Sequence, residues 1–236
     1  MPKSIAKSRL VLYIAEIVTM LICILLFYAK LYVALSYGIW LILFIGVLII
    51  IEKRQMTAEE MVIIASLSAI AAVGRTIFAP IPSVQPVSFI IICAASVFGW
   101  RTGLLVGMLS AFVSNLFLGQ GPWTIWQMLC WGLMGLVAGY IFNTHKVKSK
   151  NVKMVFGFFA GILFGWIMNI WYLASYVENV SLAGIAVAYA ASAYMDLLHG
   201  LSNVFFIAVF LSSLEKILYR IKNKYGILND ANSLNT

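Results

Sequence analysis

Polar side chains that could do chemistry occur at a few points of an otherwise apolar sequence. Asp196, His199 and Asn203 lie in one long apolar run at spacings of three and seven residues, so they share one face if the run is a helix. Exposing an ionisable side chain to lipid at the centre of a span costs about 2.5 to 3.5 kcal/mol on insertion scales. These side chains are therefore candidates for a functional site, with Arg75 as a candidate partner for Asp196. The alternative is an internal ion pair that only ties two helices together.

A second group combines amides with tryptophans and follows a loop that contains three prolines, at 79–86. Aromatic faces next to a few hydrogen-bonding groups suit a flat heterocyclic ligand, although tryptophans also form belts at membrane interfaces. A belt does not explain the neighbouring amides. The predicted substrate-binding set is Arg75, Gln85, Asn115, Gln120, Trp123, Trp126, Gln127, Asn169, Asp196, His199 and Asn203.

Sequence motifs for catalysis are absent. The chain has no HExxH, no GxSxG with a paired histidine, no DDxxD-like acidic pair and no P-loop. Asp196 and His199 resemble an acid/base pair, but no nucleophile or metal-ligand cluster accompanies them. We therefore expect no catalytic residues, no metal site and no cofactor.

The elements that must position these residues are membrane-spanning helices. Of 236 residues, 63% are hydrophobic and 10% are charged, which cannot cover a water-soluble globule with polar surface. In hydrocarbon, backbone groups must be satisfied within their own segment, so long apolar runs predict an all-α polytopic bundle. The expected helices cover about 10–28, 32–51, 58–78, 87–98, 103–118, 125–142, 154–176 and 183–214. The fourth and fifth are short and could form a hairpin that barely spans.

The basic residues orient this bundle. A net charge of +8 could indicate nucleic-acid binding, but the basic residues form short clusters between apolar runs, which is typical of cytoplasmic loops. With the N-terminus inside, all of the 16 Lys and Arg residues except Lys30 and Arg75 fall on the cytoplasmic side. We therefore expect a multi-pass protein of the cell membrane, with both termini cytoplasmic and no nucleic-acid partner.

The chain is expected to have three parts. Residues 1–55 form a two-helix appendage with few polar side chains, residues 56–220 form a six-helix core, and residues 221–236 form a polar cytoplasmic tail. Within the core, small residues recur at every fourth position, as in Ala65 and Ala69 or Gly103 and Gly107. Such spacing lets helices approach closely, either within the chain or against a partner.

Several of these features together resemble the substrate-binding S components of energy-coupling factor (ECF) vitamin transporters. They are ASLSA at 65–69 with Arg75, the proline-rich loop, SNLFLGQGPWT at 114–124 and DLLHG at 196–200. The resemblance covers about residues 58–220, and the first two helices are an addition to the usual six-helix pattern.

The resemblance implies the partners and the location of the site. In that family an AxxxA face, here Ala65 and Ala69, docks on a transmembrane coupling protein, and two cytoplasmic ATP-binding subunits drive uptake. The substrate lies near the extracellular side, under the loops that correspond to 81–86 and 119–126 here. It would be a vitamin or cofactor precursor, with a cobalamin-related compound as one candidate.

Two other classes stay open from the sequence. A membrane-embedded enzyme could use Asp196 and His199 on a lipid or peptide and would turn over without ATPase partners. An ion-coupled carrier would transport alone, although no inverted repeat is evident.

Overall fold

The computed structural model describes residues 13–22, 34, 38–39, 41–42, 45–46, 49, 56–177 and 181–227, and these residues form helices without any strand. This confirms the predicted all-α, polytopic fold class. The core helices are α3 (Ala58–Phe78), α4 (Val87–Phe98), α5 (Trp100–Leu118), α6 (Trp123–Gly139), the π-helical turn η1 (Tyr140–Thr144), α7 (Lys150–Tyr176) and α8 (Leu182–Tyr225).

Side-chain caps set where three of these helices begin. The hydroxyl of Thr57 accepts a hydrogen bond from the Glu60 amide at 3.3 Å at the start of α3. Ser149 and Ser181 accept equivalent bonds at the starts of α7 and α8. These bonds satisfy backbone donors that have no partner inside the helix. At the other end of α8, Gly226 adopts a left-handed conformation, φ 61°, that favours glycine.

Helix α4 forms the centre of the bundle. All twelve of its residues are buried. It is joined to α5 through Gly99, whose φ of 93° is open to glycine and strained for other residues. The amide of Asn143 donates to the carbonyls of Ser96 and Val97 at 3.1 and 3.0 Å, so the end of α4 is hydrogen-bonded from the turn after α6. The fourth and fifth predicted helices are joined directly as expected, and α4 is short and buried, but α5 starts at Trp100 and is long enough to cross a membrane.

Glycines bring neighbouring helices into contact. A methyl group on Gly107 would overlap the backbone of Trp131, and one on Gly103 would overlap the backbone of Gly135, so α5 and α6 touch backbone to backbone. Gly161 of α7 faces Gly200 of α8 in the same way. These small-residue faces serve packing inside the chain.

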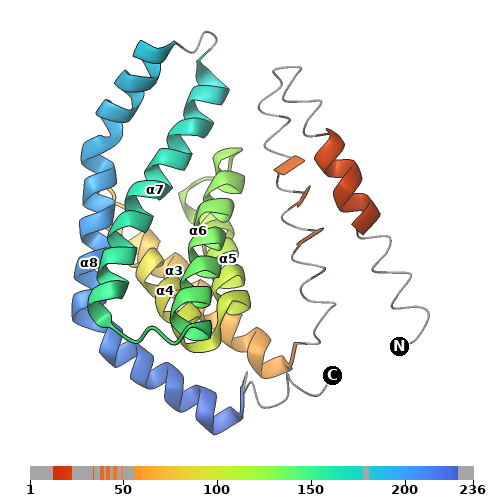
Figure 1. Ribbon diagram of the computed structural model, residues 1–236, viewed down its shortest axis with the longest axis vertical. Helices are drawn as coiled ribbons and strands as arrows, with labels where there is room; N and C mark the ends of the chain where they lie inside the picture. Colours follow the sequence, from red (N-terminus) through yellow and green to blue (C-terminus); the bar gives the residue numbers. More distant parts are fainter. Residues whose placement is uncertain are drawn as a thin grey trace.

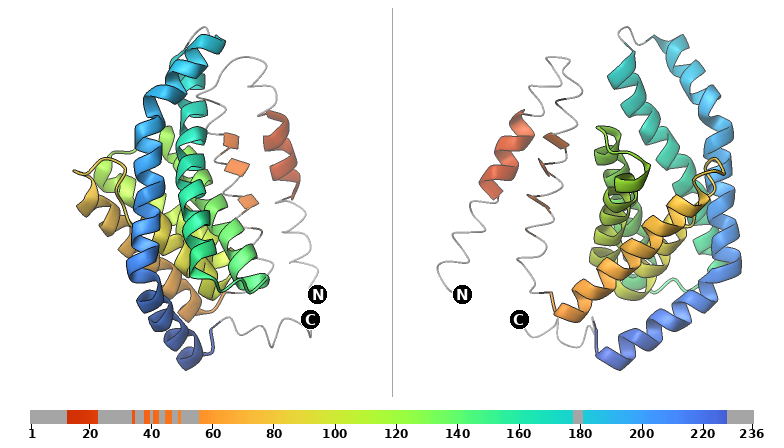
Figure 2. Two further views of the ribbon diagram at one scale, coloured as in Figure 1. Left: turned by 60° about the vertical axis from the view of Figure 1, so that its left-hand side comes forward. Right: turned by 180° about the vertical axis from the view of Figure 1, so that it is seen from behind.

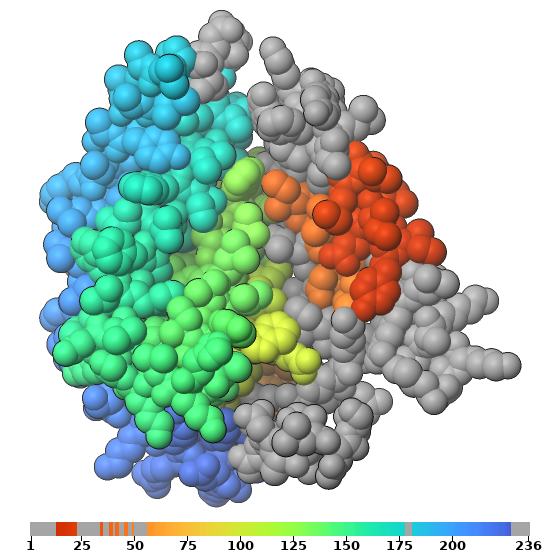
Figure 3. All heavy atoms as spheres, viewed as in Figure 1, coloured from red at the N-terminus to blue at the C-terminus, as the bar shows by residue number. Residues whose placement is uncertain are grey.

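Figure 1 shows α3 to α6 side by side, with α7 and α8 as a long antiparallel hairpin beside them. Seen from behind, α3 runs obliquely across the bundle and its end comes beside α8 (Figure 2), where the rings of Phe78 and Phe206 pack at 5.5 Å. In the space-filling view the side chains of α6 and α7 meet across the front of the molecule (Figure 3). The C-terminal end of α8 turns under the bundle in all ribbon views.

Five of the described helices are long and apolar enough to cross a membrane, counting α6 with η1 as one. The predicted ranges 58–78 and 87–98 match α3 and α4 residue for residue. The last helix was expected to end at residue 214 but continues to Tyr225. Part of the first predicted helix is a short apolar helix, Tyr13–Ile22. The second lies mostly outside the described residues.

Candidate functional site

A polar cluster surrounds the guanidinium group of Arg75. One terminal nitrogen donates to the Ser114 hydroxyl at 2.7 Å and to the Asn115 side-chain oxygen at 2.6 Å. The other reaches the Gln127 side-chain oxygen at 3.4 Å. The Asn115 amide nitrogen donates in turn to Thr124 and Gln127, each at 2.8 Å. We call these five residues the Arg75 cluster.

Three helix ends build this cluster. Arg75 lies in the last turn of α3, Ser114 and Asn115 lie near the end of α5, and Thr124 and Gln127 lie at the start of α6. The chain reverses between α5 and α6 at Gly119, which has a φ of 105°. Because that turn is short, the end of α5 and the start of α6 stay adjacent. The cluster therefore lies at one end of the bundle, beneath the loop at 119–122.

A line of aromatic and hydroxyl groups continues from the Arg75 cluster into the core. The guanidinium carbon lies 5.0 Å from the centre of the Trp131 ring, within cation–π range. The Trp131 indole nitrogen donates to Ser88 at 3.3 Å, and Ser88 is 3.0 Å from Nε2 of His199. His199 is buried against the ring of Phe164. The predicted site residues Arg75 and His199 thus belong to one connected network.

No carboxylate among the described residues lies within ion-pair distance of Arg75, so the expected pairing with Asp196 does not occur there. The Asp196 carboxylate instead accepts a hydrogen bond from Ser192 at 2.9 Å, and Ser192 accepts one from Asn169 at 2.6 Å. The carboxylate fills the space above Gly165, where a methyl group would overlap it. Asn169 and Asp196 form a separate polar group between α7 and α8.

Three further predicted site residues, Gln85, Gln120 and Asn203, form hydrogen bonds outside the Arg75 cluster. The Gln85 backbone is held by Ser202, whose hydroxyl accepts from the Gln85 amide at 3.0 Å. The Gln120 side chain is exposed and donates to the Phe112 carbonyl at 3.0 Å. The fully buried Asn203 donates to the Gly157 carbonyl at 2.9 Å, which ties α8 to α7. The side-chain oxygen of Asn203 is buried without a hydrogen-bond partner among the described residues.

The predicted tryptophans lie at the start of α6, next to the Arg75 cluster. Trp123 and Trp126 are half-buried. The Trp123 ring meets the ring of Trp171 from α7 at 6.1 Å and an angle of 67°, and Trp171 meets Tyr176 at 5.5 Å. An aromatic surface therefore adjoins the cluster on the α7 side.

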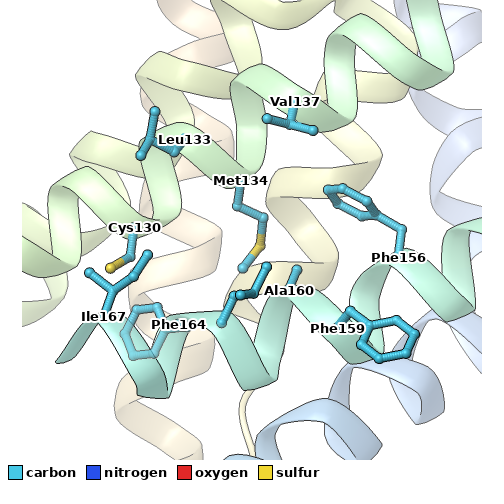
Figure 4. Close-up of a pocket in the computed structure, with 10 residues that line it drawn as sticks. Cys130, Leu133, Met134, Val137, Phe156, Phe159, Ala160, Phe164 and Ile167 are labelled. Atoms are coloured by element: carbon cyan, nitrogen blue, oxygen red, sulfur yellow. The ribbon is translucent and has the colours of Figure 1, made fainter. Parts of the chain in front are cut away.

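An apolar cavity of about 270 Å³ lies between α6 and α7. Figure 4 shows Met134 at its centre, with Cys130, Ile167 and Phe164 toward one end and Phe156 at the other. Its lining carries no charged side chain. Phe164 separates the cavity from His199 and Trp131, so this space suits only an apolar group.

A buried cation with different surroundings lies at the opposite end of the bundle. Lys153, in the first turns of α7, forms an ion pair with Glu215 of α8 at 2.5 Å. The Lys153 side chain is 5% exposed and that of Glu215 is 19% exposed, so the pair is largely desolvated. Within the described residues no group of three or more His, Cys, Asp or Glu side chains could hold a metal ion.

The sequence prediction missed several residues that complete these networks. Ser88 and Trp131 connect Arg75 to His199, and Ser192 joins Asn169 to Asp196. A single serine in an apolar helix is usually bonded to its own backbone, so its type alone gives no signal. The signal for Ser192 was its spacing of four residues from Asp196.

The fold and the site define a helical membrane protein with an internal polar cluster at one end of its bundle. Residues 59–221 match the family described as the ECF transporter, substrate-specific component. The chain belongs to this family. It is also 25% identical over 147 residues to a UPF0397 protein of Vibrio atlanticus (strain LGP32), an alignment that covers 60% of this chain and 72% of that protein. No solved structure matches the chain significantly.

Membership confirms the resemblance read from the motifs and gives the protein its general role. It is a multi-pass membrane protein and a substrate-specific component of a transporter. S components work with membrane coupling and ATPase modules, and the family is not an enzyme family. Asp196 and His199 have separate hydrogen-bond partners, Ser192 and Ser88.

Proposed function

We propose that this protein binds a vitamin or cofactor precursor from the outside and delivers it inward together with a coupling protein and two ATP-binding subunits. A cobalamin-related compound is one candidate substrate. In this proposal both termini are cytoplasmic, and the Arg75 cluster lies in the outward half of the bundle, at the end where α5 turns into α6. Residues 56–220 act as the substrate-binding core, and residues 1–55 are an appendage to it.

The main support for this proposal is the set of groups that surround the Arg75 side chain. Its guanidinium is held by neutral oxygens of Ser114, Asn115 and Gln127, and no carboxylate of the described residues neutralises it. A desolvated cation is costly unless a partner compensates it. A polar or anionic group of a substrate would supply that compensation. The neighbouring amides and the Trp123 ring would orient the rest of the molecule.

A separate surface suits the coupling protein. Ala65 and Ala69 are exposed on α3, whereas Ile64, Leu67 and Ser68 on the same helix are buried. Two small residues one turn apart let another helix approach closely. We propose that this face of α3 docks on the coupling protein, and that Ala65→Leu with Ala69→Leu separates docking from substrate binding.

The experiment is uptake in cells together with co-purification. Cells would be grown in yeast extract supplemented with cobalamin, the protein would be extracted in detergent, and bound proteins and small molecules would be identified by mass spectrometry. The expected result is a coupling protein, ATP-binding subunits and one vitamin-like compound. The double leucine variant should lose the protein partners by about tenfold or more and keep the compound.

Two results would count against the proposal. A chain that carries lipid or peptide and turns it over alone would be an enzyme. Uptake that persists without ATP-binding subunits would indicate an ion-coupled carrier.

A further inference from the structure

Five buried side-chain polar atoms of the described residues have no hydrogen-bond partner, and only on α7 do two of them, both donors, lie within one turn of a helix. These two donors are the indole Nε1 of Trp171 and the hydroxyl of Ser175. Trp171 as a whole is only 9% exposed. The two residues are four positions apart in a helix, so they share one face of α7. We call this pair the Trp171 subsite.

Unsatisfied buried donors are rare in folded proteins. Burying a donor without an acceptor costs the desolvation energy that a hydrogen bond would otherwise recover. Tryptophan can be replaced by phenylalanine, and serine by alanine, in positions that need only packing. Two such donors within one turn of a helix therefore point to an acceptor that belongs to another molecule.

The surroundings indicate what kind of acceptor this is. The Trp123 ring lies 6.1 Å from the Trp171 ring, and the Tyr176 ring lies 5.5 Å from it. Trp123 is the first residue of α6, next to Thr124 of the Arg75 cluster. The Trp171 subsite thus adjoins the cluster through the start of α6 and is bordered by aromatic rings.

We propose that Trp171 Nε1 and Ser175 Oγ donate hydrogen bonds to the substrate and select a planar ring that carries carbonyl or ring-nitrogen acceptors. The ring lies against Trp123, and a polar or anionic group on the same molecule reaches Arg75. This inference rests on the proposed function and defines its substrate class. The proposed site is separate from the apolar cavity between α6 and α7, whose lining includes neither Trp171 nor Ser175.

The test uses the full chain and conservative variants. Trp171→Phe keeps the ring and removes the donor, and Ser175→Ala removes the hydroxyl. Matched controls are Trp166→Phe on α7, since Trp166 is 48% exposed, and Ser212→Ala on α8, since Ser212 is exposed. Each protein would be produced in cells grown with yeast extract and cobalamin. The retained compound would be identified by mass spectrometry and then titrated onto ligand-free protein.

The expected result is a planar compound with acceptor atoms, bound about tenfold more weakly by each of the two subsite variants and unchanged in both controls. Without the compound, Ser175→Ala should melt like the original protein, because the hydroxyl has no partner to lose. Subsite variants that bind as tightly as the original, or a retained compound without a ring, would overturn the inference and leave the transport function standing. An original protein that retains nothing from this medium would overturn the transport proposal as well.

Discussion

Arg75 and Lys153 are both cations held inside the bundle, and their surroundings differ. Lys153 forms an ion pair with Glu215 and also lies 5.4 Å from the Phe142 ring. Arg75 has hydroxyl and amide oxygens around it and the Trp131 ring beside it, with no carboxylate of the described residues in contact.

The difference separates a structural cation from a binding cation. A paired buried charge joins α7 to α8 and leaves nothing for a ligand to compensate. An unpaired charge held only by dipoles keeps its capacity to attract a polar or anionic group. On this account, changes at Lys153 should affect folding and changes at Arg75 should affect binding.

The largest effect on stability is expected at the ion pair between Lys153 and Glu215. Glu215→Leu leaves the Lys153 ammonium buried without its carboxylate, which should lower the free energy of unfolding by about 3 to 5 kcal/mol. Denaturation in detergent micelles measures this. The double variant Lys153→Met, Glu215→Leu should recover most of the loss, and binding by the folded fraction should not change. A single variant that melts like the original protein would break the comparison.

At Arg75 we expect the larger effect on binding and the smaller effect on stability. Arg75→Met should weaken retention of the co-purified compound by about 100-fold and lower the melting temperature less than Glu215→Leu does, because it removes hydrogen bonds to neutral groups and breaks no ion pair. The matched control is Arg101→Met, since Arg101 also lies against a tryptophan, at 5.1 Å from Trp100, but at the other end of α5. Equal losses in both variants would mean that net charge matters and the Arg75 cluster does not.

A smaller effect is expected where helices touch. Gly107→Ala would place a methyl group against the Trp131 backbone, and overpacking of this kind costs about 1 to 3 kcal/mol. Because α5 carries Asn115, binding should also weaken. Thermal unfolding checks the first effect, with Gly184→Ala as control, where the nearest atom is the Ser181 hydroxyl at 3.3 Å. Equal stability of the two variants would contradict the packing described for α5 and α6.

The smallest effect concerns the proline-rich loop. Ser202→Ala removes the acceptor for the Gln85 amide, a bond of about 1 kcal/mol, so that amide should exchange its hydrogen about fivefold faster. Hydrogen–deuterium exchange of the 79–86 loop reports it, with Ser212→Ala as control. Unchanged exchange in the Ser202 variant would show that the prolines alone hold the loop.

The helices could be predicted from the sequence because hydrocarbon requires apolar runs. The prolines at 80–86 separate the expected ranges 58–78 and 87–98, and these ranges match α3 and α4. The end of α8 does not match, because Lys216, Arg220 and Lys222 interrupt the hydropathy signal but not the helix. Charged residues are good helix formers, and α8 therefore continues until Gly226 ends it.

The sequence identified most polar residues of the candidate site, but only partly which of them contact each other. Arg75, Asn115 and Gln127 were singled out as costly polar groups, and the structure brings them together. Which of them would meet depends on how helices far apart in sequence cross, and spacing along one helix carries no such information. The expected partner Asp196 lies on α8 with Ser192, while Arg75 lies with the ends of α5 and α6.

The most direct test of the account is a crystal structure of the protein purified from cells grown in yeast extract with cobalamin. We expect non-protein density within hydrogen-bond distance of the Arg75 guanidinium and against the Trp123 ring. Density confined to the apolar cavity between α6 and α7, with the Arg75 cluster closed on itself, would contradict it.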